Sequence, residues 1–232
     1  MARFGVGAVS PWWNAGFVCN PFRAVSGDEW RAVALLPVAA RECLRKEDAP
    51  GLQVLGDAGR GKSSLLHAIV REATPLQKQT IYEYVPRESE SFVSEVAHGT
   101  WFCLDEAQRL NPREHDRLLR MAREKSVRLL LAAHENLAPL FAAAQMPLDT
   151  VNLAHLGDAH FAAVLTNRLR YFARPGVETA TLAPDAITYL RERFGGDLRG
   201  AERFLYEHFQ TRDQSPVPIM MRGLMQESQP LP

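Results

Sequence analysis

The residues with the clearest chemistry lie at positions 56–63, which read GDAGRGKS. This run fits the phosphate-binding loop pattern G-x-x-x-x-G-K-[ST]. Its glycines let backbone N–H groups turn around a phosphate chain without side-chain clashes. In this pattern Lys62 reaches the β- and γ-phosphates, and the Ser63 hydroxyl holds Mg²⁺. A glycine-rich turn that binds nothing is the alternative. The expected phosphate-binding residues are Gly56, Asp57, Ala58, Gly59, Arg60, Gly61, Lys62, Ser63 and Ser64.

A second group, Asp105 and Glu106, directly follows the apolar run 101–104. If that run is a parallel strand, the two carboxylates lie at its carboxyl end, where open α/β sheets bind their ligands. Asp105 would then hold Mg²⁺, directly or through water. Glu106 would orient and deprotonate an attacking water. A solvated acidic turn after a core strand is the alternative interpretation.

A polar group also follows the next apolar run, at 128–133. His134 is the first candidate to touch a γ-phosphate or an attacking water, and Asn136 is the second. The alternative is a strand-end histidine that faces solvent.

Arg199 is the last candidate, and it follows Gly195-Gly196 between two expected helices. In the first turn of the last helix, its guanidinium could stabilise charge on a γ-phosphate. The alternative is a surface arginine that pairs with Glu202 or Asp197.

The elements that must position these groups alternate between strand and helix. Apolar runs predict five strands, and the segments between them include amphipathic helices, which favours a parallel sheet flanked by helices on both faces. Beyond Gly157 the apolar spacing is helical. The expected organisation is a lead-in segment packed on the α/β core, the core itself, a helical lid and a loose tail, at residues 1–25, 26–156, 157–212 and 213–232. The expected strands are 52–55, 80–85, 100–104, 128–133 and 150–153.

Composition narrows the class of protein. The chain has 232 residues, 46% of them hydrophobic, so a sizeable core is possible. Its formal net charge is zero, which gives no bulk attraction to nucleic acid. The three cysteines have neither metal-ligand nor disulfide spacing. With no expected signal peptide or membrane-spanning segment, we predict a cytoplasmic location.

Four elements, taken in their order along the chain, resemble the AAA+ ATPase family. They are the GDAGRGKS loop, the LDEAQ acidic motif, the polar residue after the next strand and the GGDLR arginine. The resemblance covers roughly residues 15–210. It implies an AAA+ core with a C-terminal lid, ATP and Mg²⁺ as cofactors, and a Walker A motif at Lys62 and Ser63. It also implies that Asp105 and Glu106 are Walker B, that His134 is sensor one and that Arg199 is sensor two. The implied catalytic residues are Glu106, Lys62, Arg199 and His134, and the implied metal ligands are Ser63 and Asp105.

Within that family, the short segment GRGKSSLLHA and the brief connector at 86–99 are similar to the same parts of small bacterial replication initiators and helicase loaders. The Asn20-Pro21-Phe22 lead-in and the DEAQ run are similar to ATPases of transposition and secretion systems. The resemblance implies an ATP-hydrolysing switch or loader in DNA metabolism, acting on a protein or DNA partner. The alternatives are a nucleotide-binding adaptor with negligible turnover and a small-molecule P-loop kinase.

One feature departs from the family pattern. Residues 132–167 contain neither Arg nor Lys, although AAA+ rings usually supply an arginine finger near the end of the core. Arg120 or Arg123 could serve instead, or a partner protein could supply the charge. We therefore expect slow hydrolysis by the isolated chain. A homo-oligomer remains one of the open arrangements.

Overall fold

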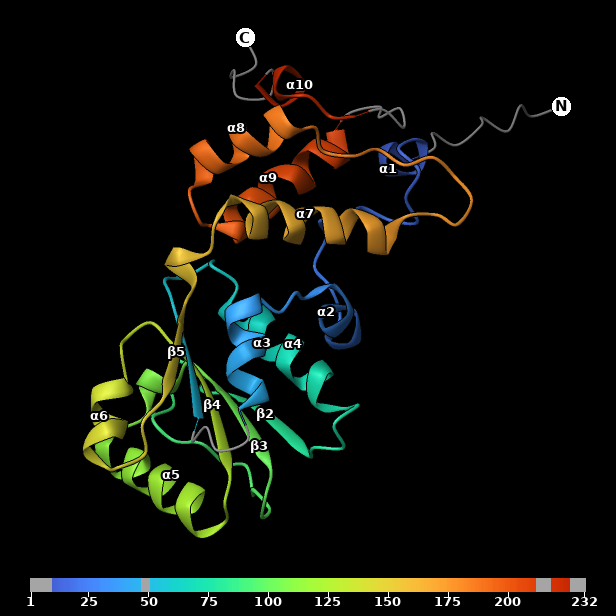
Figure 1. Cartoon of the computed structure of the whole chain (residues 1–232). Helices are drawn as coiled ribbons and strands as arrows, with labels where there is room; N and C mark the ends of the chain where they lie inside the picture. Colours follow the sequence, from blue (N-terminus) through green and yellow to red (C-terminus); the bar gives the residue numbers. More distant parts are fainter. Residues whose placement is uncertain (1–9, 47–50, 212–217, 226–232) are drawn as a thin grey trace, which may run out of the picture. The chain divides into compact units, whose positions relative to one another are not determined.

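The computed structural model describes residues 10–46, 51–211 and 218–225. The chain divides into two compact units (Figure 1). Residues 26–160 form the first, which we call the α/β unit. Residues 1–25 and 161–232 form the second, which we call the helical unit. The division falls in the first turn of α7 (Asp158–Phe172).

The α/β unit contains a parallel five-stranded sheet with the strand order β2-β3-β4-β1-β5. This confirms the predicted α/β fold class. The strands match the expected apolar runs within one or two residues. They are β1 (Gly51–Leu55), β2 (Thr80–Tyr84), β3 (Trp101–Asp105), β4 (Arg128–Ala133) and β5 (Asp149–Asn152).

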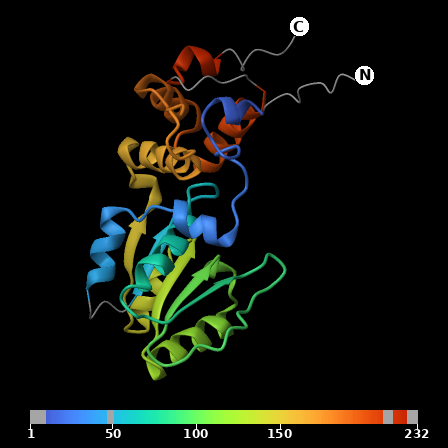
Figure 2. The same cartoon turned by 90° about the vertical axis from the view of Figure 1, so that its right-hand side faces the viewer.

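Helices cover both faces of this sheet (Figures 1 and 2). Alternate residues of β4 face opposite sides, as strand geometry requires. Leu130 packs in one apolar cluster with α4, and Leu129 and Leu131 pack in another with α5. Burial on both faces explains why the central strands are continuous apolar runs. The helices of this unit are α2 (Gly27–Val33), α3 (Val38–Arg45), α4 (Lys62–Ala73), α5 (Pro112–Glu124) and α6 (Ala138–Ala143), with 3₁₀ turns η1 (Ala107–Arg109) and η2 (Leu153–His155).

Local sequence signals set the ends of α2 and α3. The Ser26 hydroxyl accepts a hydrogen bond from the Glu29 backbone N–H, and the Glu29 carboxylate accepts one from the Ser26 backbone N–H. This reciprocal capping box begins α2. Pro37 then separates α2 from α3, because proline fits the start of a helix and not its interior.

The lead-in segment, which the sequence predicted to pack on the α/β core, belongs to the helical unit. Its described residues, 10–25, pack on the helices of that unit. Phe17 forms a bridge with Ala173, and its ring lies 5.5 Å from the Phe209 ring. The buried Arg168 side chain donates to the Pro21 carbonyl at 2.9 Å. Burial of apolar rings against these helices stabilises this arrangement. The helices are α1 (Pro11–Asn14), α7, α8 (Pro184–Phe194), α9 (Leu198–Thr211) and α10 (Met221–Met225).

The predicted loose tail is packed over residues 218–225. Ile219 forms a bridge with Leu182, and Leu224 is fully buried. Two apolar side chains therefore anchor this part of the tail despite the polar residues around it. The rest of the predicted tail, 213–217 and 226–232, lies outside the described residues. Among the helices that the structure describes, none has the length and apolar character needed to cross a membrane.

Candidate nucleotide-binding site

The predicted phosphate-binding loop connects β1 to α4. Gly59 and Gly61 have φ angles of +81° and +90°, a left-handed conformation that other residues rarely adopt. Gly61 is also the N-terminal cap of α4. The loop therefore ends at the positive end of a helix dipole, where the first N–H groups of a helix have no carbonyl partner of the preceding turn and suit a phosphate.

Lys62 lies within this loop and is 6% exposed. Its Nζ donates to the Gly56 carbonyl at 2.8 Å and to the Asp57 carbonyl at 3.1 Å. Nζ is also 3.4 Å from His134 Nδ1 and 3.2 Å from His134 Nε2. The loop thus holds one cation against its own backbone, in contact with a side chain from the end of β4.

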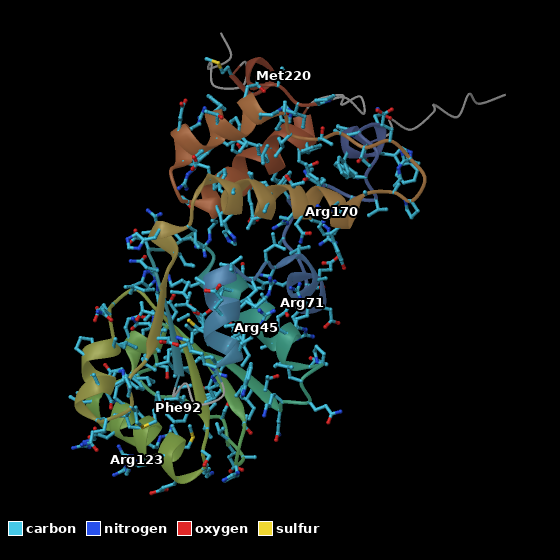
Figure 3. The ribbon with its side chains drawn as sticks, viewed as in Figure 1. Arg45, Arg71, Phe92, Arg123, Arg170 and Met220 are labelled. Carbon is cyan, nitrogen blue, oxygen red and sulfur yellow. The ribbon has the colours of Figure 1, made fainter. Side chains whose placement is uncertain are left out.

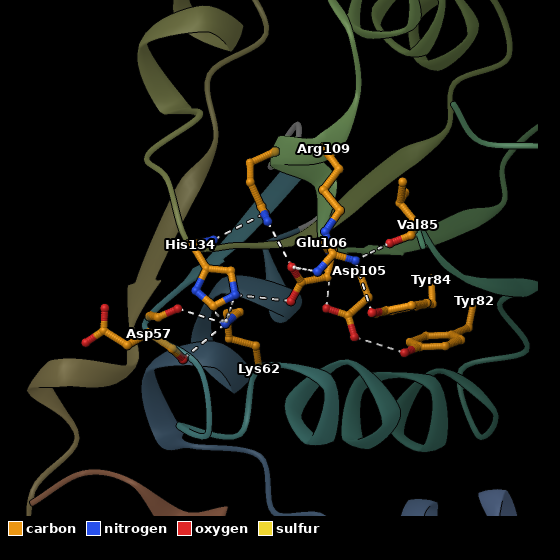
Figure 4. A network of polar contacts seen from close by, with 11 residues as sticks. Asp57, Lys62, Tyr82, Tyr84, Val85, Asp105, Glu106, Arg109 and His134 are labelled. Atoms are coloured by element: carbon orange, nitrogen blue, oxygen red, sulfur yellow. Dashed lines mark hydrogen bonds and ion pairs between the residues drawn. The ribbon is translucent and has the colours of Figure 1, made fainter. Parts of the chain in front are cut away.

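The strand order explains why these groups meet. β4 lies between β1 and β3, with Leu55 opposite Ala133 and Asp105 opposite Ala132. The carboxyl ends of the three strands are therefore adjacent and almost level. The structure brings Lys62, Asp105, Glu106 and His134 to one edge of the sheet (Figure 4).

Glu106 has a left-handed backbone with a φ of +60°. This conformation costs a non-glycine residue about 1–3 kcal/mol and occurs often at functional sites. The Glu106 carboxylate accepts a hydrogen bond from Gln108 at 2.9 Å and pairs with Arg109 at 2.8 Å. His134 Nε2 lies 3.2 Å from its other oxygen. A proton on Nε2 lets His134 donate to Glu106 and accept from Lys62 through Nδ1.

These contacts set the ionisation of Glu106. Partial burial acts to raise its pKa, but the Gln108 hydrogen bond and the charges of Arg109, His134 and Lys62 outweigh burial and lower the pKa. Glu106 is consequently ionised at neutral pH and can accept a proton. The side chain is 12% exposed, so water can reach it only from a limited direction.

Asp105 is fully buried. One carboxylate oxygen accepts from the Tyr82 hydroxyl at 3.0 Å, and the other accepts from the Glu106 backbone N–H at 3.0 Å. Since each carboxylate oxygen has two lone pairs, Asp105 retains acceptor capacity. No group of three or more His, Cys, Asp or Glu residues that could hold a metal ion gathers among the residues described. Mg²⁺ usually takes only one or two protein ligands together with phosphate oxygens and water, and the assignment of Ser63 and Asp105 as those ligands stays a prediction.

A row of aromatic side chains extends from Asp105 to α2. The Tyr82 ring stacks on His67 at 4.4 Å, and His67 packs on Trp30 at 4.5 Å. Trp30 in turn donates to the Ser64 hydroxyl at 2.9 Å. Burial lowers the pKa of His67, which keeps the stacked imidazole neutral. This row connects the acidic strand end to α4, the helix that begins with Lys62.

Other predicted residues have different surroundings. Asp57 and Ala58 are exposed, and Arg60 pairs with Asp57 at 3.2 Å. Asn136, the second candidate after β4, accepts from Gln53 and from the Ala138 backbone N–H, which separates its oxygen from the contacts made by Lys62.

Arg199 is the second residue of α9, in the helical unit, and its side chain is exposed. Glu202, one of the surface partners considered for it, pairs with Arg168 at 3.2 Å. Burial raises the pKa of Glu202, while the nearby charges of Arg168 and Arg199 act to lower it, so Arg199 lies close to this carboxylate. Asp197 accepts from the Gly200 backbone N–H at 3.0 Å. No hydrogen bond or ion pair holds the Arg199 guanidinium within the described part of the chain. Its predicted role as sensor two stays a prediction.

The sequence prediction did not include three residues of this site: Tyr82, Gln108 and Arg109. Gln108 and Arg109 are close to Glu106 in the sequence. A tight turn expected directly after β3 could have indicated that their side chains lie near the Glu106 carboxylate. Tyr82 is 23 positions from Asp105, and only the parallel pairing of β2 with β3 brings it close.

Comparison with known proteins agrees with the fold of this chain. No family model matches the chain, and no curated protein matches it. Solved structures do match. A variant of Thermotoga maritima RuvB has a TM-score of 0.59 and 16% identity over 89% of this chain and 72% of its own. Brucella abortus NtrX in complex with ADP has a TM-score of 0.52 and 15% identity over 84% of this chain and 57% of its own.

The replication initiator DnaA bound to AMPPCP and single-stranded DNA has a TM-score of 0.52. Its identity is 14%, over 82% of this chain and 62% of its own. These neighbours are AAA+ P-loop ATPases. The likeness and the sheet order show that this chain has the fold of AAA+ P-loop ATPases, as the sequence motifs predicted.

Proposed function

We propose that this protein is an AAA+ type ATP-binding and ATP-hydrolysing switch or loader subunit. The observation that carries the proposal is the meeting of Lys62, Glu106 and His134, in contacts of 3.2–3.4 Å, beside a glycine loop that begins a helix. A phosphate chain requires backbone N–H groups and a cation, and its hydrolysis requires a carboxylate beside them. This edge of the sheet offers all three.

Each residue has a defined task in this proposal. The loop N–H groups and Lys62 bind the phosphates, and Ser63 and Asp105 hold Mg²⁺, which neutralises phosphate charge when bound. Glu106 orients and deprotonates the attacking water. His134 fixes Glu106 and Lys62 relative to each other, since it contacts both side chains. Arg199 would report the γ-phosphate to the helical unit.

DNA metabolism is the proposed setting, in replication or transposition. Two of the structural neighbours are described as a Holliday junction branch migration motor and as a replication initiator bound to single-stranded DNA. Because this chain shares their fold, we propose DNA or a DNA-bound protein as its partner. On the same ground, a homo-oligomer is one of the assemblies to be tested.

A nucleotide-binding adaptor is the second candidate, and the sequence of residues 132–167 favours it. That stretch carries no Arg or Lys that could complete a neighbour's site. An arginine supplied in trans accelerates some nucleotide hydrolases by about 10³–10⁵. ATPase rate per subunit, measured across protein concentrations and then with DNA or candidate partners, distinguishes the two. A rate that stays at background under every condition would support the adaptor.

Lys62→Ala is the direct test of the site. We expect calorimetry to show that this variant loses ATP binding, while circular dichroism shows an unchanged fold. Arg87→Ala is the matched control, because Arg87 is an exposed cation of the same unit outside the loop. Unchanged ATP affinity in Lys62→Ala would remove the basis of the proposal.

A further inference from the structure

A groove lies at the amino edge of the sheet, opposite the candidate nucleotide site. Its volume is about 1050 Å³, and its lining includes Trp101 and Arg128, the first residues of β3 and β4. Asp105, at the other end of β3, is about 13 Å away along the strand. The groove is therefore a separate feature of the α/β unit.

The rim of the groove is cationic. Arg41, Arg45, Lys78 and Arg128 line it, and Glu72 is the one carboxylate among the lining residues that the structure describes. Glu72 pairs with Arg71 at 3.3 Å, which offsets its charge. This local excess of positive charge stands out in a chain whose formal net charge is zero.

Three of these cations, Arg41, Arg45 and Lys78, make no side-chain hydrogen bond or ion pair within the part of the chain that the structure describes. Figure 3 labels Arg45 on α3. Arg128, in contrast, is held in place by the Leu44 and Cys43 carbonyls at 3.0 and 2.8 Å and lies over the Trp101 ring.

The floor and walls of the groove are apolar. Leu36, Leu44, Trp101 and Val127 form much of the floor, each less than 9% exposed. Leu76 stands in the wall and is 57% exposed. An exposed leucine beside buried apolar side chains offers a place to bury an apolar anchor.

We propose that this groove is the docking site for an acidic segment of a partner protein, whose apolar side chains enter the groove while its carboxylates meet the cationic rim. Charge complementarity selects the acidic partner, and the apolar floor selects a peptide over a nucleic acid. A nucleic acid is attracted through its phosphates to a row of cationic side chains, and apolar side chains add nothing to that attraction. Since every lining residue lies within the α/β unit and away from Lys62, docking does not require ATP.

The experiment measures fluorescence anisotropy of a labelled peptide in which leucine alternates with glutamate. We expect saturable binding to the full chain that weakens as salt is raised. Binding should disappear when glutamine replaces glutamate in the peptide, or when serine replaces leucine. In the protein, the double variant Arg45→Glu/Lys78→Glu should weaken binding about tenfold or more, because two attractive contacts become repulsive. Leu76→Ser should weaken it as well.

Arg87→Glu is the control, since it reverses an equally exposed charge outside the groove and should bind the peptide as the wild type does. Lys62→Ala should also bind it normally, which separates this proposal from the proposed ATPase function. Circular dichroism confirms that each variant is folded. The proposal is overturned if the wild-type chain does not bind the acidic peptide, or if the double variant binds it equally well. A labelled single-stranded oligonucleotide is tested in the same way. If the wild-type chain binds the oligonucleotide instead of the peptide, and the double variant does not, the groove is a nucleic-acid site and the proposal is overturned.

Discussion

At the scale of residues, the site centres on Glu106. Its left-handed backbone turns the carboxylate away from the course of β3. Gln108, Arg109 and His134 then hold the carboxylate in its ionised form. The same contacts that keep it charged also restrain it, so its neighbours should govern both the rate of hydrolysis and the pH dependence of that rate.

Glu106→Gln should bind ATP about as tightly as the wild type and hydrolyse it far more slowly. The amide keeps the shape and the polar contacts of the side chain but cannot accept the proton of the attacking water. Loss of a general base typically costs about 10²–10⁴ in rate. Calorimetry and steady-state phosphate release check the two halves of this prediction. Glu88→Gln, at an exposed position of the same unit, is the control; an intact rate in Glu106→Gln would show that another group is the base.

Arg109→Gln should shift the pH profile of hydrolysis. The Arg109 charge lowers the pKa of Glu106, so its removal raises that pKa. A base must be deprotonated to act, and the acid limb of the rate profile should therefore move to higher pH. The ATPase rate is measured from acid to neutral pH, with Arg113→Gln on the exposed face of α5 as the control. If both variants keep the wild-type profile, Arg109 does not tune the base.

At the scale of elements, the phosphate site depends on where β1 ends and α4 begins. The two left-handed glycines of the loop place successive backbone N–H groups at the start of the helix. In the sheet, β4 lies between β1 and β3, so that residues from the loops after these three strands meet. The meeting of Lys62, Glu106 and His134 is thus a property of the sheet edge rather than of one motif.

Gly61→Ala should disturb both stability and ATP binding. An alanine with a φ near the +90° of Gly61 costs about 1–2 kcal/mol. A shifted loop also weakens N–H contacts to phosphate, which should reduce ATP affinity about tenfold or more. Gly99→Ala is the matched control, since Gly99 has a φ of +72° and open space around it. Urea unfolding should show similar losses in the two variants, whereas calorimetry should show weaker ATP binding in Gly61→Ala alone; equal ATP affinities would contradict the prediction.

At the scale of the whole molecule, the chain consists of an α/β unit and a helical unit that includes the lead-in segment. Two units in one chain suit a switch, because a ligand that contacts both can shift a conformational equilibrium. Arg199 is the proposed reporter in the helical unit. Its guanidinium is exposed and lies near the Glu202 carboxylate.

Arg199→Ala should weaken ATP binding more than ADP binding, because only ATP has the γ-phosphate that the guanidinium would contact. It should also reduce any ATP-dependent change of shape measured by small-angle scattering. Arg203→Ala is the control on the same helix, where Arg203 pairs with Glu207 at 3.4 Å on the surface. An equal loss of ATP and ADP affinity would mean that Arg199 supports the helical unit without sensing the nucleotide.

The sequence by itself determined the local parts of this protein. The glycine pattern around Lys62, the acidic pair after β3 and the capping box at Ser26 each depend on residues close together in the chain, and their physical causes act over a few positions. The apolar runs predicted all five strands because parallel strands are buried on both faces. Residues Asp105, Glu106 and His134 could be chosen as site residues because each follows such a run.

Only the tertiary structure decided which distant groups meet. Strand order put Tyr82 beside Asp105, and the turn after β3 put Arg109 against Glu106. The lead-in segment packs on α7 and α9 because the rings of Phe17 and Phe22 bury against Phe209. The groove lined by Trp101 likewise combines residues from five separate stretches of chain. Contacts of this kind arise from burial and pairing between elements, which the periodicity of a single segment does not record.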